Sequence, residues 1–413
     1  MSARASGAQQ PRAAAREVVM KFGGSSLATP ELRALAVKRV RDKLAAGARP
    51  VIVVSALGRA PAPYATDTLL DLAPGIKGGP NRDLLLSCGE TISASIFAAL
   101  LESEGIPARA LTGAQAGIHT DANHGDARVV AVEPDNLRTL LDAGVTPVVA
   151  GFQGIAEDGS VTTIGRGGSD LTAVVLARAL GNVQCEILTD VDGVMSADPK
   201  RVPAAHTVEE LTFEELDELA GLGASVMHDK AAQVARDGRT PYSIRSLRTG
   251  VGTGVGAERT LASDHPVTGI ATMLGYTFLH VVPEAAAMPG GWETEIFRVM
   301  AESGVNLDCI NVNAAGVFFI VRDDELELAR KLLDALPVAA RATRDCAKIS
   351  IVGSGMRGTP GVMYKVVKAL VSNGVPIIHS TDSNITISIL VPGAVAAAAE
   401  QSLHDYFGLG KDA

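Results

Sequence analysis

The chain from Val18 to about Ser246 alternates short strand-like runs with helical stretches, and this alternation limits the possible folds more than any other feature. Several of the strand-like runs are apolar almost throughout, as expected when both faces of a sheet are covered. The predicted strands are Val18–Phe22, Val51–Ser55, Pro147–Ala150, Val183–Leu188 and Tyr242–Arg245. The predicted helices are Pro30–Ala46 with Thr29 as N-cap, about Arg82–Glu104, and Ser169–Leu180. The pattern predicts an α/β fold, a parallel sheet with helices on both faces.

Beyond the glycine-rich stretch Gly250–Gly256, the chain repeats itself. When Glu295–Ile320 is laid over Lys365–Leu390, the segment SGVNL aligns with NGVPI and VFFIV aligns with TISIL. Each copy is predicted to run strand, helix, strand, strand, helix, which is a split βαβ (ferredoxin-like) arrangement. The sheet of such a module has one covered face, so paired modules predict a shared interface and a homodimer formed through this half of the chain.

At 413 residues the chain is too long for one ordinary core. The predicted divisions are an N-terminal extension at 1–16, a catalytic domain at 17–250, a linker at 251–264, and two repeat modules at 265–343 and 344–413. The first segment contains arginine, alanine and serine without an acid, which is compatible with a transit peptide. Because it is short and has no amphipathic pattern, we expect a disordered extension.

Composition excludes several classes of function. The net charge of −9 argues against nucleic acid or an anionic membrane as a partner, because both require a basic face. The four cysteines have no short spacing between any two, which fits neither a disulfide framework nor a zinc site and indicates a reducing compartment. The most apolar run we identify, Val51–Leu57, is shorter than a membrane span. We expect a cytoplasmic protein.

A glycine pair directly follows the first predicted strand, in the segment KFGGSS. Gly23 and Gly24 allow the backbone to approach a phosphate closely, and Lys21 adds a positive charge. The spacing differs from that of a P-loop, because no Gly-Lys-Ser/Thr closes the segment. Taken alone, a tight turn is as good an interpretation as a phosphate-binding loop.

A second glycine-rich segment, TIGRGGSD, precedes the helix at Ser169. Backbone N–H groups, the helix dipole and Arg166 converge there, an arrangement suited to a carboxylate or a phosphate. The alternative is a glycine-rich turn capped by Ser169. We expect Arg166 to be buried, and a buried arginine favours the anion site over the turn.

Two further segments are candidates for a functional site. The acidic run Thr189–Lys200 lies at the carboxyl end of a predicted strand, where open α/β sheets bind ligands. Its spacing excludes an EF-hand, so a nucleotide-binding loop is the better interpretation. In Ser87–Glu90, a small turn is predicted to open the long apolar helix, and Glu90 could simply be a first-turn acid that stabilises the helix dipole.

No plausible Ser–His–Asp or Cys–His set is evident, and no histidine pair has the spacing of metal ligands. A reaction that needs a strong general base is therefore disfavoured. Phosphorylation of a carboxylate needs no such base, because the nucleophile is already ionised at neutral pH. It requires lysine, backbone N–H groups and Mg²⁺ to neutralise two converging anions, and these residues match that requirement.

Taken together, the segments resemble the aspartate kinase family over almost the whole chain. They occur in the family's order: KFGGSS, VSALG, LLSCGETIS, LTGAQAG, VVAGFQG, TTIGRGGSD, TDVDGVMSADP and the repeat. GRGGSD alone is shared with other amino acid kinases, but the full series is specific. PYATDTLLDL and the methionine in DGVMSADP are similar to the monofunctional, diaminopimelate-sensitive subgroup. The resemblance implies a three-layer α/β/α amino-acid-kinase fold followed by two ACT domains.

The resemblance also implies roles for individual residues. ATP with Mg²⁺ would be bound by Lys21, Phe22, Gly23, Gly24, Ser55, Ser169, Thr189, Asp190, Met195, Lys200, Ser225 and Val226. L-aspartate would be bound by Thr66, Asp67, Thr68, Glu90, Arg166, Gly167 and Gly168. In the catalytic set, Arg166 grips the substrate carboxylate, and Asp170 organises Lys21 and the transferring phosphoryl group. Glu90 would pair with the substrate ammonium.

One position departs from the family pattern. The family's Gly-Ala-Lys-Val motif, whose lysine reaches the phosphates, is Gly223-Ala-Ser-Val226 in this chain. Ser225 therefore removes a charge that can be worth about three orders of magnitude in rate. Lys230, close by in the sequence, is a candidate to supply it.

The expected function is phosphorylation of aspartate to 4-phospho-L-aspartate, which begins the synthesis of lysine, threonine and methionine. Two alternatives remain: a catalytically weak amino-acid sensor, which Ser225 motivates, and a kinase for another acidic amino acid such as glutamate. The family also implies feedback by lysine or diaminopimelate between ACT modules of two subunits. The predicted effector site comprises Pro360, Gly361, Ile377, Ser380, Asp382, Asn384 and Ile385. There a helix start would bind the effector carboxylate and Asp382 its ammonium, although an ordinary helix entry and polar hairpin are the alternative.

Overall fold

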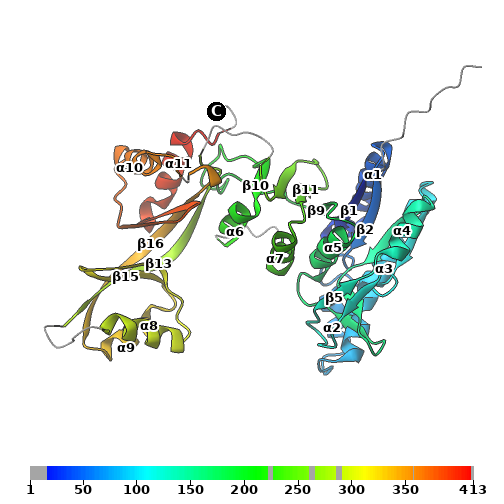
Figure 1. Cartoon of the computed structure of the whole chain (residues 1–413), viewed down its shortest axis with the longest axis horizontal. Coiled ribbons are helices and arrows are strands. Elements are labelled where there is room, and N and C mark those ends of the chain that lie inside the picture. The colour runs from blue at the N-terminus through cyan, green and yellow to red at the C-terminus, as the bar shows by residue number, and fades with distance from the viewer. Residues whose placement is uncertain (1–15, 222–226, 260–265, 285–290, 357, 411–413) are drawn as a thin grey trace, which may run out of the picture. The chain divides into compact units, whose positions relative to one another are not determined.

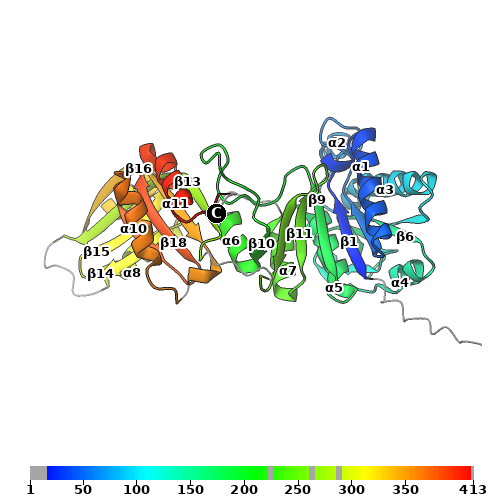
Figure 2. The same cartoon turned by 90° about the horizontal axis from the view of Figure 1, so that it is seen from above.

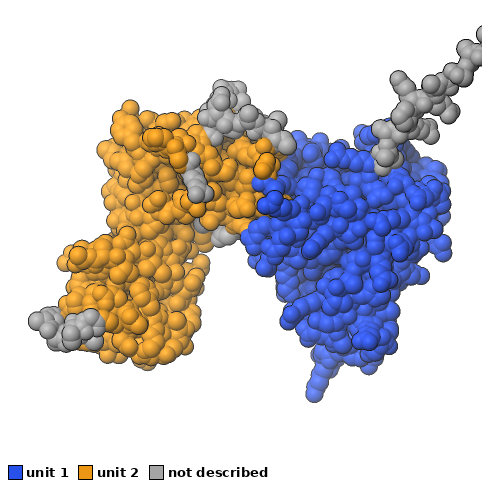
Figure 3. Space-filling model, viewed as in Figure 1, with its two compact units in different colours: residues 1–193, 226–257 blue, residues 194–225, 258–413 orange. Residues whose placement is uncertain are grey.

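The structure is a computed structural model that describes the chain except residues 1–15, 222–226, 260–265, 285–290, 357 and 411–413. It consists of two compact units, drawn in different colours in Figure 3. The first contains residues 1–193 and 226–257, and the second contains residues 194–225 and 258–413. The predicted catalytic domain at 17–250 is therefore not one continuous compact unit, because residues 194–225 cluster with the C-terminal half.

The first unit is built on a mainly parallel sheet whose strands run in the order β12-β11-β9-β1-β2-β6-β3. Figure 1 labels β11, β9, β1 and β2 of this sheet. The strands are β1 (Glu17–Phe22), β2 (Arg49–Val54), β3 (Ala108–Leu111), β6 (Thr146–Ala150), β9 (Gln184–Thr189), β11 (Tyr242–Ser246) and β12 (Gly252–Gly256). Strand β1 pairs in parallel with both β2 and β9, so its carboxyl end lies centrally between two parallel neighbours. The five strands predicted from sequence are confirmed.

Helices cover both faces of this sheet. They are α1 (Pro30–Ala45), α2 (Thr66–Asp71), α3 (Pro80–Ser103), α4 (Asp135–Asp142), α5 (Gly168–Ala179), α7 (Asp229–Gly238) and the short 3-10 turn η1 (Ser25–Leu27). Helices α1 and α3 pack on the face that carries Met20 and Phe22. Helix α5 contacts β1 and β9 and packs against α7. Since side chains alternate along a strand, Lys21 points away from the α1/α3 layer. The predicted N-cap Thr29 accepts a hydrogen bond from Leu32 N at 3.4 Å.

A smaller sheet of the first unit has the order β5-β4-β7-β8. Its strands are β4 (Ile118–Thr120), β5 (Val129–Val132), β7 (Gln153–Ile155) and β8 (Val161–Thr163). Buried Asp83 of α3 fixes the end of this sheet, because its carboxylate accepts hydrogen bonds from Thr163 N (2.8 Å), Thr163 Oγ1 (2.9 Å) and Gly125 N (3.0 Å). Strand β8 leads directly into the segment TIGRGGSD, so this network supports the candidate site.

Two sequence predictions are wrong in this unit. Residues 252–256 of the predicted linker form β12, because they pair antiparallel with β11 and extend the sheet. Helix α3 is long and apolar enough to cross a membrane by length and composition alone, contrary to our estimate that apolar runs were too short. Half of its most apolar window is buried within the protein, and Asp83 and Glu90 lie among its buried residues. These features are those of a core helix.

The second unit contains one sheet in the order β14-β15-β13-β16-β18-β17. Its strands are β13 (Gly269–Pro283), β14 (Asp308–Asn313), β15 (Gly316–Arg322), β16 (Val338–Val352), β17 (His379–Asp382) and β18 (Thr386–Pro392). Its helices are α8 (Trp292–Glu302), α9 (Leu326–Asp334), α10 (Val362–Ser372) and α11 (Ala396–Tyr406), with 3-10 turns η3 (Ser354–Met356) and η4 (Gly393–Val395). Strand β10 (Glu210–Thr212) and helix α6 (Phe213–Gly221) also belong to it. Figure 2 shows α10 and α11 beside β16 and β18.

The predicted repeat is confirmed, since each copy runs strand, helix, strand, strand, helix. The two copies nevertheless share their longest strands. The first half of β13 (269–274) pairs with the end of β16, and its second half (276–283) pairs with both β15 and the start of β16. Helices α8 and α9 form one core with β13 and β15, and α10 and α11 form another with β16 and β18. The predicted boundary between residues 343 and 344 therefore falls inside β16.

Candidate active site

An ion pair lies at the carboxyl end of the central strand β1. Lys21 Nζ is 2.6 Å from Asp170 Oδ1 of α5, and the two side chains are only 12% and 16% exposed. The two atoms are at ion-pair distance without hydrogen-bond alignment, so the carboxylate oxygen can still accept another donor. Parallel pairing of β1 with β2 and β9 places Lys21 beside Val53 and Ile187, at the sheet edge where open α/β folds bind ligands.

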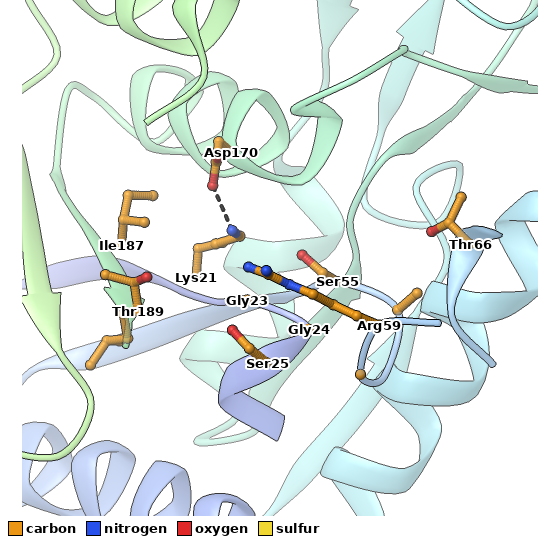
Figure 4. A pocket seen from close by; sticks show the side chains of 13 residues that line it. Lys21, Gly23, Gly24, Ser25, Ser55, Arg59, Thr66, Asp170, Ile187 and Thr189 are labelled. Carbon is orange, nitrogen blue, oxygen red and sulfur yellow. Dashed lines mark ion pairs between the residues drawn. The ribbon is translucent and has the colours of Figure 1, made fainter. Parts of the chain in front are cut away.

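The predicted phosphate loop forms one wall of a cavity of about 300 Å³. Figure 4 shows this cavity, with Lys21 and Asp170 above Gly23 and Gly24. A β-carbon on Gly24 would lie 2.5 Å from the carbonyl oxygen of Ala56, and Gly58 N donates a hydrogen bond to Gly24 O at 3.0 Å. Gly24 therefore allows the loops after β1 and β2 to approach each other, which a larger residue would prevent.

The structure adds residues that the sequence reasoning missed. Ser25, Ala56, Gly58, Arg59 and Ile187 also line the cavity. In Figure 4 the guanidinium group of Arg59 points toward Lys21, so a second positive charge faces the same space. The segment VSALGR carried a signal for this role, because an arginine directly after a glycine turn at a strand end is well placed for an anion.

The segment Gly165–Gly168 forms a tight turn at the start of α5. Gly165 and Gly167 have positive φ angles of 78° and 75°, a conformation that glycine adopts without strain. A β-carbon on Gly167 would also lie 2.1 Å from the ring of His228. Gly168 packs against Phe152 and Ile164. The loop is therefore held by contacts that require glycine.

Our expectation that Arg166 is buried is wrong. Its side chain is exposed, in a turn where both flanking glycines have positive φ angles. Arg166 makes no hydrogen bond or ion pair with any residue that the structure describes, so its guanidinium group is available to an anion. The argument from burial against the capped-turn alternative is therefore lost, and the carboxylate role rests on the unpaired charge.

Glu90 lies in the middle of α3, not in a first turn, so the helix-dipole interpretation is wrong. Its side chain is buried, and Oε1 accepts a hydrogen bond from Ala56 N at 3.1 Å. Burial raises the pKa of Glu90 to about 8. Oε2 has no partner among the described residues. A buried acceptor without a donor is costly, which favours a bound cation such as a substrate ammonium.

Thr66, Asp67 and Thr68, which were predicted to contact aspartate, are the first three residues of α2. Thr66 lines the cavity, and the hydroxyl of Thr68 is buried without a hydrogen-bond partner in the described chain. Asp67 is exposed. Tyr64, just before α2, packs closely against Gly89 of α3: a β-carbon on Gly89 would lie 2.9 Å from Tyr64 O.

The predicted nucleotide residues lie in different parts of the structure. Lys21, Gly23, Gly24, Ser55 and Thr189 line the cavity, and Ser169 is buried near it in the first turn of α5. The side chain of Phe22 is fully buried and its ring packs 5.4 Å from that of Phe97, so only its backbone is available. Asp190 does not line the cavity, although it accepts a hydrogen bond from Thr189 Oγ1. Met195 and Lys200 belong to the second unit, and Ser225 and Val226 lie outside the described residues.

Lys230, the candidate replacement for the missing family lysine, forms an ion pair with Asp126. Asp126 in turn lies against Gly165, where a β-carbon would meet its carboxylate. The ammonium group of Lys230 is thus paired with a carboxylate beside the Gly165–Gly168 turn. This pairing makes Lys230 a weaker candidate for binding phosphates.

The cavity therefore offers cations and backbone donors for a phosphate chain. The exposed guanidinium of Arg166 and the buried carboxylate of Glu90 offer complementary groups for an amino acid. In the described part of the chain, no group of three or more His, Cys, Asp or Glu side chains is arranged to hold a metal ion.

The predicted effector residues lie around α10 and β17 in the second unit. Gly361 is the N-cap of α10 with a φ of 88°, and exposed Pro360 precedes it. Exposed Asp382 ends β17, and Asn384 lies in the turn to β18. Ser380 is in β17, Ile377 packs partly against the core of α10 and α11, and Ile385 ends the turn.

Comparisons with known proteins identify the class of this fold and site. A model of the amino acid kinase family matches residues 16–246, more than half of the chain, so the chain belongs to the amino acid kinase family. A model of the ACT domain matches residues 341–405.

Individual relatives narrow the assignment. Aspartokinase 1 of Bacillus subtilis (strain 168) is 39% identical over 403 residues, which cover 95% of this chain and 99% of the relative. The chain is therefore a member of the aspartokinases, the amino acid kinases that phosphorylate aspartate. The structure of E. coli aspartokinase III with aspartate and ADP is 25% identical, with a TM-score of 0.65 over 94% of this chain and 99% of that one. The same enzyme with lysine and aspartate has a TM-score of 0.71 over the same shares at 24% identity, a likeness in fold.

Proposed function

We propose that this chain transfers the γ-phosphoryl group of ATP to the side-chain carboxylate of L-aspartate through the residues described above. The observation that carries the mechanism is the Lys21–Asp170 ion pair beside the glycine-lined cavity. Lys21 and Arg59 neutralise the phosphate chain, and the loop of Gly23 and Gly24 brings backbone N–H groups close to it. Asp170 holds the Lys21 ammonium in place, and Ser55 and Thr189 line the remaining walls.

Aspartate is bound by groups of opposite charge. Arg166 offers a fork of N–H donors to a carboxylate, and Glu90 offers the unpaired oxygen Oε2 to the ammonium. Thr66, Thr68, Gly167 and Gly168 help to position the substrate. The attacking carboxylate is ionised at neutral pH, so catalysis consists of alignment and neutralisation of charge.

Mg²⁺ enters with ATP as part of the substrate. It would supply positive charge to the phosphate chain, and the protein contributes a polar cavity next to the carboxylate of Asp170. The ADP bound to E. coli aspartokinase III supports a nucleotide substrate for this fold.

Regulation is the second part of the proposal. The chain is inhibited by lysine or diaminopimelate bound at the second unit by Pro360, Gly361 and Asp382, in a homodimer formed through the ACT modules. The segment PYATDTLLDL supports the diaminopimelate-sensitive subgroup. E. coli aspartokinase III binds lysine, which supports an amino-acid effector in this fold. The four free cysteines support action in the cytoplasm.

One coupled assay tests the catalytic proposal. ADP release is measured with aspartate, with glutamate and without an amino acid. Turnover with aspartate but not with glutamate supports the proposed reaction. Equal turnover with glutamate would show that the enzyme accepts acidic amino acids more broadly. Turnover with neither, in folded protein that binds lysine or diaminopimelate, would favour the catalytically weak sensor that Ser225 suggests.

A further inference from the structure

The acidic segment that follows β9 is packed on the regulatory sheet and its last helix. Val194, Ala197 and Val202 are buried, and the segment belongs to the second unit. Ile270 N of β13 donates a hydrogen bond to Ser196 O at 2.8 Å. The two side chains of this segment predicted to contact nucleotide, Met195 and Lys200, therefore sit on a backbone whose support comes from the C-terminal half of the chain.

Glu400 of α11 is the centre of that support. Its side chain is completely buried, and each of its oxygens meets the segment. Oε2 accepts a hydrogen bond from Arg201 Nε at 2.6 Å, and Oε1 accepts one from Asp198 N at 3.3 Å. Arg201 also donates to the carbonyl of Thr272 in β13 at 3.2 Å. Both oxygens of this buried carboxylate meet one loop and hold it in place, and removing the carboxylate would leave Arg201 only its ion pair with Asp198 of the same loop, at 3.3 Å.

A second contact from the same helix lies one turn further on. His404 is fully buried, and its Nε2 is 3.1 Å from Ser196 Oγ. The same hydroxyl oxygen accepts a hydrogen bond from His206 N at 3.1 Å, which closes the segment on itself. Glu400 and His404 are spaced by four residues and so lie on one face of α11. One helix face therefore holds the segment at two points, Ser196 and Asp198–Arg201.

The held positions flank the two candidate nucleotide residues. Met195 is adjacent to Ser196, and exposed Lys200 lies between Asp198 and Arg201, with Lys200 N donating to Asp198 Oδ1 at 2.9 Å. A side chain that contacts a ligand is effective only when its backbone is held in place. The contacts that α11 makes with Ser196, Asp198 and Arg201 therefore fix the backbone that carries Met195 and Lys200.

We propose that Glu400 and His404, from the last helix of the regulatory module, are positioning residues for the nucleotide-binding segment Val194–Pro203. They act through Arg201, Asp198 and Ser196 and touch no substrate themselves. The inference rests on the proposed function and on the nucleotide role that the family resemblance predicts for Met195 and Lys200. It makes the affinity for ATP, rather than for aspartate, sensitive to changes in α11.

The experiment uses the full chain with three variants: Glu400→Gln, Ser196→Ala and Lys200→Ala. Glu400→Gln should raise KM for ATP on the order of ten-fold, below the hundred-fold that a misplacement of about 1 Å can cost. KM for aspartate should stay within about two-fold of the parent, because the Arg166 and Glu90 sites are unchanged. Ser196→Ala should act in the same direction with a smaller effect, and it keeps the test open if Glu400→Gln folds poorly. Arg298→Gln, which breaks exposed ion pairs on α8, is the matched control.

Hydrogen exchange provides a readout independent of turnover. Amides of residues 194–203 should exchange faster in Glu400→Gln, while those of α10 stay protected. Suppose that Lys200→Ala raises KM for ATP. The inference would then be overturned by equal increases in KM for ATP and KM for aspartate, or by a parent-like KM for ATP in both Glu400→Gln and Ser196→Ala. If Lys200→Ala leaves KM for ATP unchanged, the nucleotide role is wrong and the inference fails with it. A parent chain without aspartate kinase activity would overturn the proposed function first.

Discussion

At the scale of single residues, the site depends on three charged groups whose environments differ. Lys21 is nearly buried and paired with Asp170, Arg166 is exposed and unpaired among the described residues, and Glu90 is buried with one free oxygen. The difference in pairing predicts a different response to mutation for each. Lys21 should affect the transfer step, Arg166 the binding of aspartate, and Glu90 the pH dependence of that binding.

Replacement of Lys21 by alanine should lower kcat and kcat/KM together, on the order of a hundred- to a thousand-fold. The reason is the loss of a cation aimed at the transferring phosphoryl group. Steady-state kinetics and thermal unfolding measure the two effects separately. Lys43→Ala, which breaks the ion pair with Glu186 in the same unit, is the control. A Lys21→Ala protein that is only less stable, with unchanged activity per folded molecule, would favour the tight-turn interpretation.

Arg166→Lys should raise KM for aspartate on the order of ten- to a hundred-fold, with little change in KM for ATP. Lysine keeps the charge but cannot form the bidentate fork. Arg138→Lys, at a half-exposed arginine of α4, is the matched control. If Arg166→Lys changes both Michaelis constants equally, Arg166 does not belong to the aspartate site.

Glu90 should make aspartate binding depend on pH. Because the pKa of Glu90 is raised to about 8 by burial, its carboxyl group is neutral below that pH and must lose a proton to pair with an ammonium. The apparent Kd for aspartate should therefore fall by about ten-fold per pH unit between pH 6 and 8 and level off above pH 8. Calorimetry in buffers of different ionisation enthalpy should detect the released proton. In Glu90→Gln, binding should be weaker than in the parent above pH 8 and the slope should be absent; an unchanged slope would assign it to another group.

The linkage to folding has the opposite sign. A carboxyl group whose pKa is raised in the folded state stabilises the protein fully below its unfolded pKa of about 4.5, and this stabilisation is lost as pH rises toward 8. The same titration thus increases aspartate binding and decreases stability over the window from pH 4.5 to 8. Such a trade-off is typical of a buried group retained for binding.

At the scale of elements, the loops after β1 and β2 form the phosphate-binding wall by direct contact. Gly24 and Gly58 are linked by a backbone hydrogen bond of 3.0 Å, and the side chain of Arg59 follows directly. The same logic holds at the start of α5, where Gly151 approaches Ser169 so closely that a β-carbon would lie 2.8 Å from it. Close approach of adjacent loops at the strand ends, rather than any single side chain, shapes this cavity.

Gly24→Ala should therefore open the contact between the two loops. The added β-carbon would lie 2.5 Å from Ala56 O, so the backbone must move, at a cost of about 1–3 kcal/mol in stability. KM for ATP should rise with it. Gly75→Ala is the control, because nothing lies within 4 Å of its β-carbon position. Parent-like stability and KM in Gly24→Ala would show that the loops tolerate separation.

At the scale of the whole molecule, two units carry separate tasks. The first holds the sheet and the cavity, and the second holds the duplicated βαββα repeat with shared strands β13 and β16. Residues 194–225 lie early in the sequence yet belong to the second unit. A segment predicted to contact nucleotide is thus folded on the module proposed to bind an effector.

Feedback predicts a specific behaviour of Asp382→Ala. This change should weaken inhibition by lysine or diaminopimelate by at least about ten-fold, because it removes the carboxylate that binds the effector ammonium. Uninhibited kcat should stay the same. Inhibition curves measure the first effect and the effector-free rate the second, with Asp334→Ala as a control at an exposed acid of the same unit. Since coupling is reciprocal, the effector should also shift the affinity for a substrate. If titration calorimetry detects no binding of lysine, threonine or diaminopimelate, the second unit has no effector role of this kind.

The sequence alone determined the local parts of this protein. The strand and helix periods, the N-cap at Thr29, the repeat, and the glycine turn at positions 165 and 167 can be read from local sequence, and the structure agrees with them. The order of motifs was specific enough to indicate the family.

The tertiary structure decided everything that depends on which distant residues meet. It exposed Arg166, buried Glu90 in the middle of α3, brought Arg59 into the cavity, paired Lys230 with Asp126 and made a strand of Gly252–Gly256. Burial, and with it the raised pKa of Glu90, comes from neighbours far away in the chain. The same holds for the contact of Glu400 with Arg201, because the attraction between two charges depends on their distance in space and the medium between them, neither of which a local pattern contains.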